Sequence, residues 1–109
     1  MEGRAVITRE MLDTRMLSAS VRVPQHVVYR SFPAETVVLN LESGKYHGLN
    51  PSAGRMLKEL EQAGSVSAAA EVLAQAYDQP LATIERDLCD LCEALRERGL
   101  IELNDARPA

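Results

Sequence analysis

Apolar and polar residues alternate along the chain after residue 20, with the period of two that is typical of half-buried β-strands. The expected strands are residues 27–32, 35–41 and 45–50, with a shorter extended piece at 21–23. The middle strand places Val37, Leu39 and Leu41 on one face and Val38 and Asn40 on the other. Gly44, in the "ESGK" turn before the last strand, can take a positive φ and permits a tight reversal. Short strands joined by tight turns predict an antiparallel meander.

Beyond residue 50 the apolar residues recur every three or four positions, which is the spacing of amphipathic helices. Asn50 is a favoured N-cap, and Pro51 occupies the first helical position, where its missing N–H costs nothing. Ser65 is the expected cap of a second helix, and Pro80 opens a third helix that ends at Gly99. The third and longest helix carries one apolar stripe, which consists of Ile84, Leu88, Leu91 and Leu95.

The order of these elements predicts an α+β fold, with a three-stranded antiparallel sheet followed by three helices in a winged-helix-like arrangement. A chain of 109 residues with 46% hydrophobic residues suits one domain. We place that domain at residues 20–103, ending in a short extended piece at 100–103. For residues 1–19 we favour an arm without fixed structure over a short amphipathic helix, because chain ends are poorly ordered unless something holds them. Residues 104–109 are expected to be a disordered tail.

Composition and charge argue against several functions. The formal net charge of −4 argues against nucleic-acid binding, whose affinity comes largely from Lys and Arg on phosphates. Arg4, Arg9 and Glu10 interrupt the N-terminal apolar residues, so no signal peptide is expected, and no window is apolar enough to span a membrane. Two cysteines on one expected helix fit a reducing compartment. We therefore expect a soluble cytoplasmic protein that binds neither nucleic acid nor membrane.

Cys89 and Cys92 form a C-x-x-C pair, which can bind metal or cycle as a dithiol. A structural zinc site needs four ligands, and the sequence contains no second C-x-x-C and no H-x-x-x-H. The pair also lies in the middle of the expected helix, away from the N-terminal end that would stabilise a thiolate. We interpret both cysteines as small residues that border the core.

No cluster of residues indicates catalysis. His26 and His47 are each isolated along the sequence, whereas a catalytic base needs an orienting carboxylate and a nucleophile in reach. The glycine-rich phosphate-binding motifs and the G-x-S-x-G motif are absent. We predict no enzyme activity, no cofactor and no metal site.

A winged-helix arrangement often binds DNA through its last helix, which makes a DNA-binding regulator the alternative function. Residues 80–99 contain three arginines and five acidic residues, a balance of −2 (3 − 5). Phosphate would repel such a helix. The winged-helix-like fold therefore remains the prediction, whereas DNA recognition is disfavoured.

The third expected strand is an edge if the sheet follows sequence order. Proteins usually protect edges with charge or proline, yet "YHGLN" is uncharged, and Gly48 allows another backbone to approach closely. Such an edge beside a helix suits β-augmentation, in which an extended peptide adds a strand through main-chain hydrogen bonds. Two alternatives remain open: the N-terminal arm covers the edge, or a second copy pairs with it to form a homodimer.

Three stretches of the sequence resemble the PqqD-like family: "VVLNLESGKYHGLNPSAGRMLKEL", the alanine-rich helix that ends in "AYD", and "IERDLCDLCEALRERGLIEL". The resemblance covers residues 20–103 and is carried by the ordered combination rather than by any single motif. The "GKYHGLNPSA" stretch is most similar to members of lasso-peptide pathways. Members of this family are precursor-peptide recognition elements with a winged-helix-like fold of three strands and three helices.

The resemblance implies that the chain binds the leader segment of a ribosomally synthesised precursor peptide, as a strand added to the third strand in a groove closed by the third helix. It also implies delivery to a partner, which is a radical SAM enzyme in the pyrroloquinoline quinone pathway or a leader peptidase in lasso-peptide pathways. The implied peptide-binding residues are Tyr46, His47, Gly48 and Leu49 on the strand and Ile84, Asp87, Leu88 and Leu91 on the helix. Leu88 and Leu91 can instead be core residues, since the same stripe holds the helix down.

Overall fold

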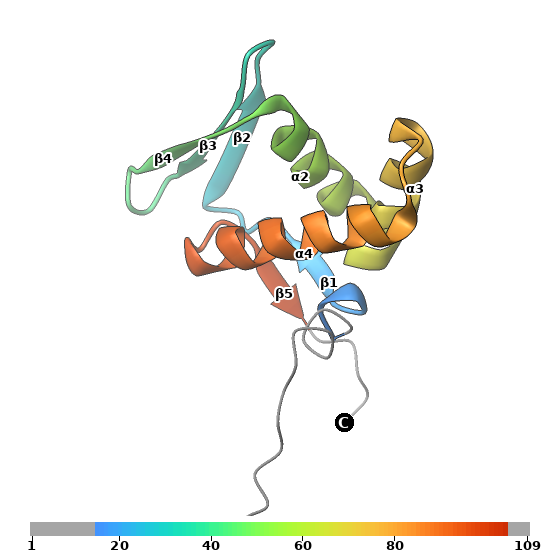
Figure 1. Cartoon of the computed structure of the whole chain (residues 1–109). Coiled ribbons are helices and arrows are strands. Elements are labelled where there is room, and N and C mark those ends of the chain that lie inside the picture. Colours follow the sequence, from blue (N-terminus) through green and yellow to red (C-terminus); the bar gives the residue numbers. More distant parts are fainter. Residues whose placement is uncertain (1–14, 105–109) are drawn as a thin grey trace, which may run out of the picture.

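A computed structural model describes residues 15–104, and the predictions for the rest of the N-terminal arm and for residues 105–109 lie outside these residues. The elements in chain order are β1 (Ser20–Arg22), β2 (Val27–Ser31), β3 (Thr36–Asn40), β4 (Tyr46–Leu49), α2 (Pro51–Ala63), α3 (Val66–Tyr77), α4 (Leu81–Glu97) and β5 (Glu102–Asn104). The predicted α+β order, a meander followed by three helices, is confirmed (Figure 1). None of the helices in the described part of the chain has the length and apolar character needed to cross a membrane.

Strands β2, β3 and β4 form the predicted antiparallel meander and are hydrogen-bonded in sequence order. The β3–β4 turn is tight because the Oδ1 of Asn40 accepts hydrogen bonds from the backbone N–H groups of Glu42 and Ser43, at 2.9 and 3.2 Å. Gly44 adopts a φ of 76°, a conformation that favours glycine, as predicted. The turn therefore fixes the register in which β4 pairs with β3.

The helix boundaries follow the capping residues of the sequence. Asn50 separates β4 from α2, and its Oδ1 accepts a backbone N–H three residues further on, at 2.8 Å. Ser65 caps α3 in the same way, at 3.2 Å. Gly99, with a φ of 73°, ends α4, and the N–H of Leu100 donates back to the carbonyl of Leu95 at 2.9 Å. These three predicted boundaries are confirmed.

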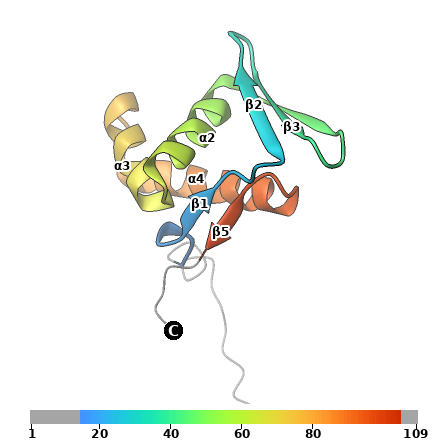
Figure 2. The same ribbon diagram turned by 180° about the vertical axis from the view of Figure 1, so that it is seen from behind.

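A second, two-stranded sheet joins the two ends of the domain, because β1 pairs antiparallel with β5. Val21 at its centre is buried and donates its N–H to the carbonyl of Gly64 at 2.9 Å. Arg22 forms an ion pair with Glu102 across the two strands. Figures 1 and 2 show this pair below α4, on the opposite side from the meander. Extended pieces at both ends were predicted, but their pairing was not.

The hydrophobic core lies between the inner face of the meander and the helices. Val38 of β3 and Leu57 of α2 are both buried there. Helix α2 approaches β3 most closely at Gly54, where an added Cβ would lie only 2.6 Å from the Cβ of Thr36. Of the two predicted faces of β3, the one with Val38 faces the core, and the one with Val37 forms the outer face of the meander.

Candidate functional site: the free edge of β4

Strand β4 forms one edge of the meander. Within residues 15–104 it is hydrogen-bonded to β3 alone, which confirms the predicted edge. The described part of the arm does not cover it, because residues 15–19 lie beside α3, where the carbonyl of Ala19 accepts the N–H of Val66 at 3.3 Å. The edge can therefore accept an added strand.

Tyr46 and Gly48 direct the polar groups of their backbone to the free side of β4. Asn40 and Lys45 form a hydrogen-bonded pair beside the turn, with the N–H of Asn40 donating to the carbonyl of Lys45 at 2.9 Å. Hydrogen-bonded pairs alternate with non-hydrogen-bonded pairs along an antiparallel ladder. The next hydrogen-bonded residue of β4 is therefore His47, while Tyr46 and Gly48 point their N–H and C=O away from β3. These two residues present the groups that a new strand would use.

The side chains of β4 alternate between the two faces of the meander. Tyr46 and Gly48 lie on the outer face, where Tyr46 is 73% exposed. His47 is half-buried and Leu49 is buried on the inner face. Glu35, from the turn between β2 and β3, reaches over Gly48, so that one carboxylate oxygen lies 2.6 Å from where a Cβ would be. Glycine thus leaves room for this side chain, which no sequence pattern indicated.

Helix α4 runs beneath the meander and holds the four helical residues assigned by resemblance, spread along two turns (Figure 1). Ile84 and Leu88 are buried, and because Leu88 is 0% exposed it attaches α4 to the core. Leu91 is half-buried against the same core, and Asp87 is exposed. Of the four, Leu91 and Asp87 therefore keep surface that a ligand can reach.

Tyr29 links the meander to α2 by a contact that the sequence did not indicate. Its hydroxyl donates a hydrogen bond to Glu61 at 2.5 Å. Burial, then this hydrogen bond and the charge of the carboxylate, raise the pKa of Tyr29 above its ordinary value. The phenol therefore stays protonated and remains a donor at neutral pH.

Cys89 and Cys92 are buried in the core, as predicted. Burial raises the pKa of the Cys92 thiol to about 12; Cys89 adds to the increase and Arg96 opposes it. At neutral pH Cys92 is thus a protonated thiol, which is a poor nucleophile and a poor metal ligand. Residues 15–104 contain no group of three or more His, Cys, Asp or Glu side chains arranged to hold a metal ion.

Residues 35–101 match the model of the family described as coenzyme PQQ synthesis protein D, PqqD. The chain belongs to the PqqD family. The matched segment of this PqqD-family chain includes β3, β4, α2, α3 and α4, but not β2. A comparison with curated proteins gave no match.

Two solved structures are similar to this PqqD-family chain. One, described as TbiB1 in complex with the TbiA(beta) leader peptide, is 27% identical with a TM-score of 0.68, and the match covers 81% of this chain and 99% of the other. The second, described as lasso peptide synthetase B1 complexed with the leader peptide, is 26% identical with a TM-score of 0.68, covering 77% and 99%. The predicted winged-helix-like fold and the resemblance to lasso-type PqqD-like proteins are thereby confirmed.

Proposed function

We propose that this PqqD-family protein binds the leader segment of a ribosomally synthesised precursor peptide as an additional strand on β4. The observation that carries the proposal is the free edge of β4, where the backbone groups of Tyr46 and Gly48 point away from β3. Both similar solved structures are complexes with a leader peptide.

Backbone pairing would supply little of the affinity. Two residues with one donor and one acceptor each offer about four hydrogen bonds, worth about 0.5–1.5 kcal/mol apiece after exchange with water. Ordering a flexible peptide costs about 1–2 kcal/mol per residue, which roughly cancels this gain. The remaining affinity must come from apolar leader side chains buried between β4 and α4. The backbone would thus set the register of the leader, and a few apolar anchors would set its affinity.

We assign the side-chain contacts to His47 of β4 and to Leu91 and Asp87 of α4. His47 and Leu91 are half-buried, so each has surface left for a leader side chain. Asp87 is exposed and would attract a basic leader residue. Ile84 and Leu88 are buried and would act indirectly, by holding α4 at its distance from the strand.

The role that we propose is non-catalytic: the bound precursor is presented to a separate enzyme that carries the chemistry. Cys92 of the C-x-x-C pair is buried, and the pKa of its thiol is raised. The thiol is therefore protonated at neutral pH, which suits a structural role. A leader peptidase is the favoured partner, because one of the similar structures is a lasso peptide synthetase component. A radical SAM enzyme is the other class of partner that the PqqD family implies.

Replacing Gly48 with proline tests the docking strand. Gly48→Pro removes an N–H that points to the free edge and leaves the bonds to β3 intact. Gly48→Ala is the matched control, because it adds a Cβ and displaces the Glu35 side chain but keeps the N–H. Losing one hydrogen bond and leaving a leader carbonyl unpaired costs about 1–3 kcal/mol, so we expect Gly48→Pro to weaken leader binding about 10- to 100-fold.

Isothermal titration calorimetry with a synthetic candidate leader peptide measures both variants, and circular dichroism verifies that both are folded. We expect Gly48→Ala to bind within about threefold of the wild type. Equal affinity of the two variants would contradict strand addition at β4. A chain that ignores the leader but binds duplex DNA with a steep salt dependence would instead be the DNA-binding regulator.

A further inference from the structure

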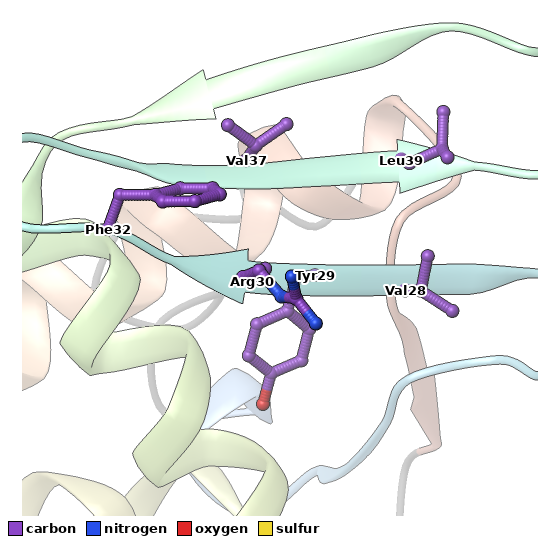
Figure 3. Close-up of a pocket in the computed structure, with 6 residues that line it drawn as sticks. All are labelled: Val28, Tyr29, Arg30, Phe32, Val37 and Leu39. Carbon is purple, nitrogen blue, oxygen red and sulfur yellow. The ribbon is translucent and has the colours of Figure 1, made fainter.

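The outer face of the meander is an exposed apolar surface that leader binding at the edge does not use. The register of the strands and the Phe32–Glu35 turn place six side chains on this face, called here the outer-face patch: Val28, Arg30, Phe32, Val37, Leu39 and Tyr46. Phe32 is 50% exposed, and a hollow of about 540 Å³ lies over β2 and β3. Figure 3 shows Val28, Arg30, Phe32, Val37 and Leu39 along β2 and β3, with Tyr29 directed away from them towards α2. Exposed apolar patches of this kind mark interaction surfaces.

Two charged side chains, Arg30 and Glu35, lie at opposite ends of one row across this patch. The register aligns Arg30, Val37 and Gly48 across β2, β3 and β4, and the carboxylate of Glu35 lies over Gly48. Two strand spacings, about 10 Å, separate the backbone positions of Arg30 and Gly48. Neither charged side chain has an ion-pair or hydrogen-bond partner among the residues that the structure describes. Along this row the side chains are therefore positive (Arg30), apolar (Val37) and negative (Glu35) in turn.

We propose that a second copy of this chain packs on the outer-face patch, related by a two-fold axis parallel to β3. Rotation about this axis places β2 over β4 of the partner subunit and β3 over its own counterpart. Arg30 then faces Glu35 of the partner subunit, and Glu35 faces Arg30 of the partner subunit. Val37 meets its counterpart at the axis, so two ion pairs flank an apolar centre.

The order of the charges favours a second copy over an unrelated partner, because a row that reads positive, apolar, negative becomes complementary to itself after this rotation. Stacked sheets lie about 10 Å apart with their strands within about 30° of each other, which one arginine and one glutamate side chain can bridge. The face is small, since its strands have only four or five residues. It falls short of the roughly 800 Å² per partner of stable complexes, so we expect a weak dimer, with a Kd on the order of 10–100 µM.

The dimer contact is independent of leader binding. The two sheets would meet through their faces, and the hydrogen-bonding groups of β4 lie in the plane of the sheet, directed to its edge. Each subunit therefore keeps a free β4 edge, and the two edges lie on opposite sides of the dimer. Failure of this proposal would leave the proposed function untouched.

Charge reversal tests the row directly. Arg30→Glu makes both charges of the row negative, and Glu35→Arg makes both positive. Each variant alone should dimerise at least about tenfold more weakly than the wild type, because both contacts become repulsive. An equimolar mixture of the two variants should restore the dimer, since each subunit then meets the opposite sign on the other. Sedimentation velocity on the full chain, without leader peptide, measures the dimerisation of the wild type, of each variant and of the mixture at protein concentrations from about 5 to 500 µM.

Matched controls carry the same charge changes elsewhere. Lys58→Glu on α2 and Glu71→Arg on α3 alter exposed residues away from the meander and should dimerise like the wild type. A wild-type chain that stays monomeric over this range overturns the proposal, as does a dimer that Arg30→Glu leaves unchanged. A mixture of the two variants that stays monomeric overturns the proposed pairing of Arg30 with Glu35. A dimer that only Gly48→Pro disrupts would place the contact at the β4 edge and overturn it too.

Discussion

Gly54 sets the distance between α2 and the meander, and its replacement with alanine tests how the candidate site is supported. A Cβ at this position would lie 2.0 Å from the Oγ1 of Thr36 and 2.6 Å from its Cβ, whereas ordinary contacts are 3.4–4 Å. Rotation of the threonine side chain can move the oxygen but not the Cβ. The helix must therefore shift away from β3 by roughly 1 Å to accept the methyl group.

The expected change in the free energy of unfolding is the difference between two opposing contributions. Alanine is favoured over glycine in a helix by about 1 kcal/mol. Overpacking of a tight interior contact costs about 1–3 kcal/mol, and the contact with Thr36 lies at the upper end because backbone atoms must move. We therefore expect Gly54→Ala to lower the free energy of unfolding by about 1–2 kcal/mol, which corresponds to a Tm lower by about 5–15 °C for a domain of this size.

Thermal and urea unfolding followed by circular dichroism measure this change. Lys58→Ala, at an exposed position of the same helix, is the control and should stay within about 0.5 kcal/mol of the wild type. Because Asn50 joins β4 directly to α2, a shift of the helix should also weaken leader binding. A Gly54→Ala variant as stable as the wild type would refute the argument from close packing.

Two further predictions concern groups with raised pKa values. A thiol reagent at pH 8 should label neither Cys89 nor Cys92 in the folded chain and both in denaturant, because burial keeps the Cys92 thiol protonated; rapid labelling of the native protein would contradict this. Tyr29→Phe should lower the free energy of unfolding by about 1 kcal/mol at pH 7, because the hydrogen bond to Glu61 is lost. The folded state raises the pKa of Tyr29. The extra free energy of unfolding of the wild type over Tyr29→Phe should therefore be present below the ordinary pKa of 10 and decline as the pH rises above it. A stability difference between the wild type and Tyr29→Phe that grows with pH would show that the phenol is not held protonated.

Elements and their boundaries could be predicted from the sequence because their signals are local. Asn50 and Ser65 cap the helices that follow them, and Gly44 and Gly99 adopt the positive φ that their turns require. The meander followed from short strands and tight turns, and its edge followed from strand order. The spacing of apolar residues also predicted the stripe on α4. Spacing alone could not decide whether Leu88 is a buried core residue or a residue that lines a peptide-binding groove.

The rest of the site depends on contacts between residues far apart in the chain. Pairing of β1 with β5 joins segments about 80 residues apart, and no local pattern encodes it. The position of Glu35 over Gly48 results from the register of two neighbouring hairpins. The outer-face patch also escaped prediction: the alternation of β3 showed two faces, but only the packing of α2 decides which one is left exposed.

Hydrogen exchange of single backbone amides of β4, with and without the leader peptide, tests strand addition most directly. In the free protein the N–H of His47 bonds to β3 and should exchange slowly, whereas the N–H groups of Tyr46 and Gly48 face solvent and should exchange fast. Saturating leader peptide should slow exchange at Tyr46 and Gly48 and change His47 far less. Protection confined to other parts of the chain, with Tyr46 and Gly48 still exchanging fast, would contradict the account.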